Sequence, residues 1–127
     1  MERLILHVGP SKTGTTAIQG MLARNRAALA RSGVCYPAVP GDDGLEGHPT
    51  LAWEILEQLG RKTVRLTASQ LNWSEALRQA DESQAHTLLI SAEDFTLDEF
   101  DDAAIALLRE YRGAQELVVI YGLRDPR

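Results

Sequence analysis

An apolar run followed at once by a glycine-rich segment constrains the fold of this chain more than any other feature. Residues 4–8 (LILHV) are apolar except for one histidine, and Gly9-Pro10 follows directly. Such a run is typical of a buried strand in a parallel sheet. From Thr15 onward, apolar residues recur at helical spacing, at Ile18, Met21, Leu22 and Leu29. The sequence therefore predicts a strand, a loop and a helix in that order, with Gly33 ending the helix.

Strands and helices are predicted to alternate along the rest of the chain. We expect short strands at 34–36, 87–91 and 117–121, the last of them buried, and helices at 51–59, 71–80 and 97–111. Thr96 and Glu99 form a capping box ahead of the last helix. The alternation predicts one domain (residues 1–127) with an α/β fold, a three-layer α/β/α arrangement around a central parallel sheet. Ligands of such folds bind at the carboxyl ends of the strands.

Composition narrows the classes of protein to which the chain can belong. Hydrophobic residues make up 44% of its 127 residues and charged residues 24%, as in an ordinary globular domain. No apolar run approaches the roughly 20 residues of a membrane span, and the start lacks the features of a signal peptide, so we expect a cytoplasmic protein. A net charge of −5 disfavours nucleic acid as a partner. The single cysteine, Cys35, cannot form an internal disulfide and is expected to pack in the core.

The segment between the first strand and the first helix has the outline of a Walker A loop. Gly9 and Gly14 are separated by four residues, and hydroxyl residues follow. Thr15 stands where a nucleotide triphosphatase has its lysine, and the lysine of this loop is Lys12. The backbone N–H groups of such a loop, with the helix N-terminus, form a nest for phosphate or sulfate. A tight turn without a ligand is the alternative, and the order of strand, loop and helix favours anion binding over it.

The displaced lysine makes the loop similar to that of one enzyme family. Residues 11–16 (SKTGTT) resemble the phosphosulfate-binding loop of sulfotransferases that use 3′-phosphoadenosine 5′-phosphosulfate (PAPS). Residues 89–95 (LISAEDF) look like a family segment that follows an inner strand, and residues 120–127 are similar to the region that reads the donor's 3′-phosphate. The resemblance implies a P-loop NTPase-like fold, PAPS as the sulfate donor without a metal, and transfer of a sulfuryl group to a hydroxyl or amine. The acceptor would be a small molecule, a carbohydrate or a lipid.

The resemblance also implies roles for individual residues. Lys12 would contact the bridging oxygen and the sulfonate, and Arg124 would hold the 3′-phosphate. The 5′-phosphate would be held by loop residues, namely Ser11, Thr13, Gly14, Thr15 and Thr16. A fixed cation with preoriented N–H donors stabilises the charge that develops on the leaving phosphate oxygen. The family pairs this arginine with a serine further downstream than Arg127, so the chain is expected to be truncated at its C-terminus.

Two residues are candidates for the base that removes the proton of the acceptor. Glu93 follows the strand at 87–91 and can point into the crevice at its end. His48 lies on a Gly/Pro-rich segment and is expected to have a near-neutral pKa. Each has a structural alternative, a turn hydrogen bond for Glu93 and a surface position for His48. His7 and His86 are expected to be structural.

Two other functions remain open on the sequence. A P-loop nucleotide kinase or NTPase would use Glu93 or Asp94 beside magnesium, although Thr15 in the lysine position weakens this interpretation. A non-catalytic fragment would keep the nucleotide cradle without the rest of the active site.

Overall fold

The structure, a computed structural model, describes residues 1–8, 15–39, 46–60, 72–96, 101–111 and 116–121. Four parallel strands form its sheet in the order β2-β3-β1-β4. They are β1 (Arg3–Val8), β2 (Val34–Cys35), β3 (Thr87–Ser91) and β4 (Glu116–Tyr121). All four were predicted from apolar runs, and the parallel pairing of β1 with both β3 and β4 confirms the α/β fold with a parallel sheet.

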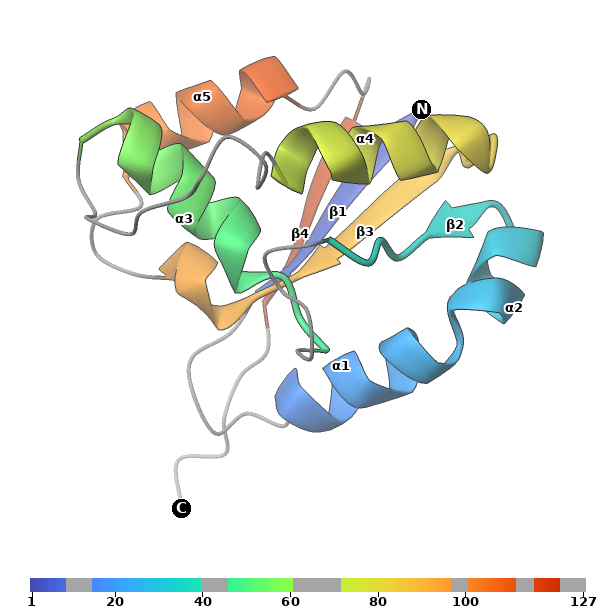
Figure 1. Cartoon of the computed structure of the whole chain (residues 1–127). Helices are drawn as coiled ribbons and strands as arrows, with labels where there is room; N and C mark the ends of the chain where they lie inside the picture. The colour runs from blue at the N-terminus through green and yellow to red at the C-terminus, as the bar shows by residue number, and fades with distance from the viewer. Residues whose placement is uncertain (9–14, 40–45, 61–71, 97–100, 112–115, 122–127) are drawn as a thin grey trace.

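Helices lie on both faces of the sheet (Figure 1). One side carries α1 (Thr15–Arg24) and α2 (Arg26–Arg31), and the other carries α3 (Pro49–Gln58), α4 (Asn72–Glu82) and α5 (Asp102–Tyr111). A short 3-10 helix, η3 (Glu93–Thr96), follows β3. No helix in the described part of the chain has the length and hydropathy needed to cross a membrane.

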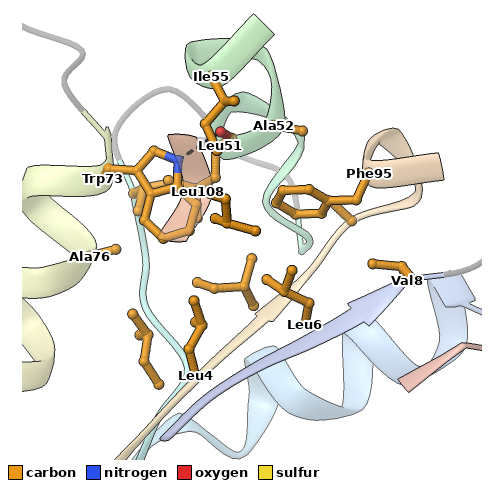
Figure 2. Close-up of a cluster of buried hydrophobic side chains, with 14 of the residues drawn as sticks. Leu4, Leu6, Val8, Leu51, Ala52, Ile55, Trp73, Ala76, Phe95 and Leu108 are labelled. Carbon is orange, nitrogen blue, oxygen red and sulfur yellow. Dashed lines mark hydrogen bonds between the residues drawn. The ribbon is translucent and has the colours of Figure 1, made fainter. Parts of the chain in front are cut away.

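The main core lies between the sheet and the helices α3, α4 and α5 (Figure 2). Alternate residues of β1 point into it, and Leu4 is completely buried. Trp73 of α4 is also fully buried, and its indole N–H donates to the Leu51 carbonyl at 2.7 Å. The members contributed by the strands and by these helices are Leu4, Leu6, Val8, Leu88, Ile90, Leu51, Ala52, Ile55, Leu56, Trp73, Ala76, Ala80, Ala104 and Leu108. Burying each large aliphatic side chain contributes about 1.5–3 kcal/mol, so this face holds the domain together. Cys35 is buried in the same core, as predicted.

A buried carboxylate joins α3 to α4. Glu54 is 4% exposed, and its Oε1 accepts from the backbone N–H of Asn72 at 2.8 Å and of Trp73 at 3.4 Å. The first N–H groups of a helix have no partner within the helix, so the carboxylate of α3 satisfies the start of α4. Burial raises the pKa of Glu54, while these two hydrogen bonds oppose the shift.

The predicted first helix is interrupted at Asn25, which is a correction to the sequence analysis. The Asn25 amide donates to the Met21 carbonyl at 2.6 Å, and its backbone departs from helical geometry. An asparagine side chain that bonds to the preceding turn competes with the helix, so two shorter helices form. Of the apolar residues that recur at helical spacing here, Ile18 and Met21 are 39% and 50% exposed, whereas Leu22 is buried.

The last helix begins at Asp102, five residues later than predicted. Asp101 caps it, because its Oδ1 accepts from the backbone N–H groups of Ala103 at 3.1 Å and Ala104 at 3.3 Å. Thr96 belongs to η3, and Glu99, the other half of the predicted capping box, lies outside the described residues.

Strand β4 was predicted to be buried, and this prediction is wrong. Val119 is 56% exposed, Ile120 47% and Tyr121 52%. The strand lies at the end of the sheet order, so β1 covers one of its edges and the described residues cover little of its faces.

Candidate functional site

The connections that leave the carboxyl ends of β1 and β3 run to opposite faces of the sheet. The connection from β1 runs through α1 and α2 over one face to β2, whereas that from β3 runs through α5 over the opposite face to β4 (Figure 1). Parallel sheets bind ligands in the crevice that opens at such a point. A ligand site is therefore expected among the last residues of β1 and β3 and the residues that follow them.

The predicted phosphate cradle is framed by described elements. Val8 ends β1 and Thr15 begins α1, and Thr16 lies in the same first turn. The cradle residues Ser11, Lys12, Thr13 and Gly14 lie outside the described residues, as does Arg124. The strand and the helix predicted on either side of the loop are both present, and the first-turn N–H groups of a helix are suited to an anion.

Glu93 lies at the carboxyl end of the sheet, as predicted. It is the first residue of η3, two residues after β3 ends, and its side chain is half-buried. Two contacts place this turn next to β1. The backbone N–H of Ala92 donates to the His7 carbonyl at 3.1 Å, and Phe95 packs into the main core. Glu93 is therefore held beside the strand that leads into the predicted cradle.

His48 differs from its prediction as a loop histidine of near-neutral pKa. It directly precedes α3 and is 1% exposed. Its Nδ1 accepts from the backbone N–H of Ser91 at 3.1 Å, and its Nε2 donates to the Pro37 carbonyl at 2.7 Å. A backbone N–H only donates and a carbonyl only accepts, so the ring is the Nε2–H tautomer with both nitrogens engaged. Burial lowers the pKa of His48 to about 4. This geometry leaves no ring nitrogen for an acceptor substrate.

His48 replaces a strand neighbour that β3 lacks. The short β2 pairs only with Thr87 and Leu88, at the start of β3. Further along, the backbone N–H of His48 donates to the Ser91 carbonyl at 2.7 Å, while the imidazole accepts from the Ser91 N–H. Both backbone groups of Ser91 are thereby satisfied within the core, where an unpaired polar group is costly.

Ser91 is a site residue that the sequence analysis missed. It is fully buried, and its Oγ accepts from Gln19 Nε2 at 3.1 Å and lies 2.8 Å from His7 Nδ1. An arrangement that satisfies all three groups has Gln19 donating to the hydroxyl and the hydroxyl donating to His7. Ser91 with His7, Gln19 and His48 is called here the Ser91 junction. One signal for it was present, since His7 interrupts an apolar strand and a serine ends the adjacent one.

The Ser91 junction is closely packed around α1. A Cβ atom on Gly47 would lie 2.6 Å from the Gln19 side-chain amide, and one on Gly20 would meet the Glu46 carboxylate. A side chain at either position would therefore force Gln19 or Glu46 to move. The side chain of Gln19 is thus confined between that segment and Ser91.

The other titratable residues that the structure describes form no second site. His86, expected to be structural, lies at the amino end of β3, where its backbone bonds to Gly33, Glu2 and Arg3. Within the described ranges, no three His, Cys, Asp or Glu side chains are grouped so that they could hold a metal ion. No family model matches the chain, and neither the curated proteins nor the solved structures gave a significant match.

Proposed function

We propose that this chain binds PAPS at the carboxyl ends of β1 and β3 and forms the donor-binding part of a sulfotransferase. The observation that carries the proposal is the placement of β1. It lies in the interior of a parallel sheet and is followed, across residues 9–14, by the first turn of α1. This is the arrangement in which a glycine-rich segment presents N–H groups to a phosphate. The P-loop NTPase-like character of the fold is part of the same proposal.

The order of the strands supports the assignment of both donor phosphates. β4 is the neighbour of β1, and Tyr121 is the register partner of Val8. Residues that follow these two strands therefore start from adjacent points of one sheet edge. Lys12 and residues 13–16 would hold the 5′-phosphosulfate, and Arg124, three residues after Tyr121, would hold the 3′-phosphate. Charge-assisted hydrogen bonds from lysine and arginine suit these anions.

Glu93 is the base in the proposed transfer. The acceptor oxygen or nitrogen forms a bond to sulfur, the bond between sulfur and the bridging oxygen breaks, and adenosine 3′,5′-bisphosphate leaves. The proton of the acceptor passes to the Glu93 carboxylate, and Lys12 stabilises the charge on the leaving oxygen. The position of Glu93 directly after β3 supports this role, whereas the engaged ring of His48 supports a structural one.

A nucleotide kinase or NTPase is the second candidate, because it would use the same strand, loop and helix. The two candidates differ in the nucleotide they bind. Thermal unfolding with adenosine 3′,5′-bisphosphate, or with ATP and magnesium, separates them, since a ligand at a hundred times its Kd stabilises by about 2.7 kcal/mol. We expect stabilisation by the bisphosphate.

Matched lysine variants sharpen this experiment. Lys12→Ala is expected to weaken bisphosphate binding about tenfold, because it removes one charge-assisted hydrogen bond. Lys62→Ala, the same change at the other lysine of the chain, is expected to bind normally. Stabilisation by ATP with magnesium alone would contradict the sulfotransferase proposal and favour the second candidate. Stabilisation by neither nucleotide would contradict both.

A further inference from the structure

The Ser91 junction connects three segments that meet at the proposed donor site. Through Gln19 Nε2 it holds α1, through His7 Nδ1 it holds β1, and through both backbone groups it holds His48. All the hydrogen bonds involved measure between 2.7 and 3.1 Å. Every polar group of Ser91 is thus engaged with a residue distant in sequence.

We propose that Ser91 is a positioning residue that fixes both flanks of the donor loop relative to Glu93. The inference rests on the function proposed above. His7 lies two residues before Gly9, and Gln19 lies four residues after Thr15, so one hydroxyl restrains the chain on each side of residues 9–14. Glu93 follows Ser91 by two residues.

The chemistry of the pair favours positioning over nucleophilic catalysis. A serine hydroxyl 2.8 Å from an imidazole nitrogen has the geometry of a nucleophile and its base. However, Ser91 is 0% exposed and His7 7% exposed, and the hydroxyl also accepts from Gln19. No substrate atom can approach an oxygen so enclosed. A buried serine whose hydroxyl and backbone groups all have partners instead makes its surroundings rigid.

Rigid flanks have a direct consequence for transfer. The sulfur must lie in line between the leaving oxygen held by the loop and the acceptor atom activated by Glu93, and small displacements of either are costly. The loop and Glu93 arise from different strands, β1 and β3. The hydrogen bonds of Ser91, together with the bond from the Ala92 N–H to the His7 carbonyl, set the distance between them.

Hydrogen exchange and binding of adenosine 3′,5′-bisphosphate test the proposal on Ser91→Ala. The matched control is Thr87→Val, which removes a buried hydroxyl at the opposite end of the same strand, where Thr87 Oγ1 lies 2.8 Å from His86 Nδ1. We expect Ser91→Ala to speed amide exchange in residues 9–19 and to weaken bisphosphate binding about five- to tenfold. Thr87→Val should affect amide exchange and bisphosphate binding only as far as its loss of folding stability explains.

A second variant keeps the test decisive where Ser91→Ala fails to fold. Gln19→Leu keeps the bulk of the side chain and removes the donor, so it should speed exchange on the α1 side and weaken bisphosphate binding, though no more than Ser91→Ala does. The double variant should lose no more affinity than the more affected single one, because both remove the same hydrogen bond. Additive losses, or exchange no faster than in Thr87→Val, would overturn the inference.

If the unmodified protein does not bind the bisphosphate, the proposed function fails, and the exchange result alone then decides whether Ser91 fixes the loop.

Discussion

The two strands beside β1 pair with it in the same parallel manner but differ in how deeply they are buried. In β3, Leu88 and Ile90 are fully buried, and the strand ends in a serine with all its polar groups satisfied. In β4, Val119 and Tyr121 occupy the core-side register beside Leu6 and Val8, yet both are more than half exposed. Similar sequences thus have different surroundings, because β3 lies inside the sheet and β4 at its edge.

The largest expected effect comes from comparing two side-chain truncations to alanine, one on each strand. Leu88→Ala is expected to cost about 2–5 kcal/mol of unfolding free energy, because it leaves a cavity in the main core. Val119→Ala on β4 should cost less than about 1 kcal/mol, since the side chain is 56% exposed. Chemical denaturation of both variants measures the difference. Equal losses would mean that β4 is as well covered as β3.

A pH titration tests the histidine that completes β3. Burial lowers the pKa of His48 to about 4 in the folded protein, against about 6.5 when unfolded. The unfolded chain therefore takes up a proton first, so stability is complete above pH about 6.5 and falls as the pH drops towards 4. The loss attributable to His48 reaches about 3 kcal/mol.

His48→Gln provides the control for that titration. Its unfolding free energy should be lower at pH 7 and should depend less on pH between about 6.5 and 4. His7, whose pKa burial also lowers, retains a contribution in both proteins. Parallel pH curves for the two proteins would assign the effect to groups other than His48.

A smaller effect is expected at the helix that connects β3 to β4. Asp101→Ala removes the cap of α5 and should cost about 1 kcal/mol, measured by thermal or chemical unfolding. Asp101→Asn keeps an acceptor oxygen and should restore most of the loss. A variant as stable as the unmodified protein would show that α5 does not depend on this cap.

The smallest effect belongs to the ion pair that links β1 to β4. Arg3 Nε and Glu116 Oε2 are 3.0 Å apart, with both side chains about half exposed. Glu116→Gln should cost less than about 0.5 kcal/mol, and added salt should abolish the difference. A larger, salt-resistant loss would indicate that β4 is held more firmly than its exposure implies.

The sequence was a good guide to elements whose signals are local. Apolar runs located all four strands, and the helical periodicity of apolar residues located α3. The break at Asn25 and the cap at Asp101 were missed. Each depends on hydrogen bonding between one side chain and the backbone, whereas the apolar spacing around each residue indicated a longer helix. The exposure of β4 was missed because an apolar run shows that a strand is suited to burial. Whether the strand is buried depends on the elements that pack on it, and the sequence of the strand does not reveal them.

The candidate site was predictable only in part, for a related reason. Its location was predictable because consecutive residues define the strand, the loop and the helix that frame it. The Ser91 junction joins positions 7, 19, 48 and 91, and no periodicity relates them. His48 was a candidate base on a segment rich in glycine and proline, with a surface position as the alternative, yet its hydrogen bonds to Pro37 and Ser91 hold it in the interior.

The fully buried indole of Trp73 has a practical consequence for all these experiments. Its ring lies in a dry environment between α3 and the sheet, with its N–H bonded to the Leu51 carbonyl (Figure 2). Indole fluorescence shifts to longer wavelength when water reaches the ring. The chain has one other tryptophan, Trp53, which is half-buried on α3. Emission colour therefore reports the docking of α3 and α4 on the sheet, optically and without a label.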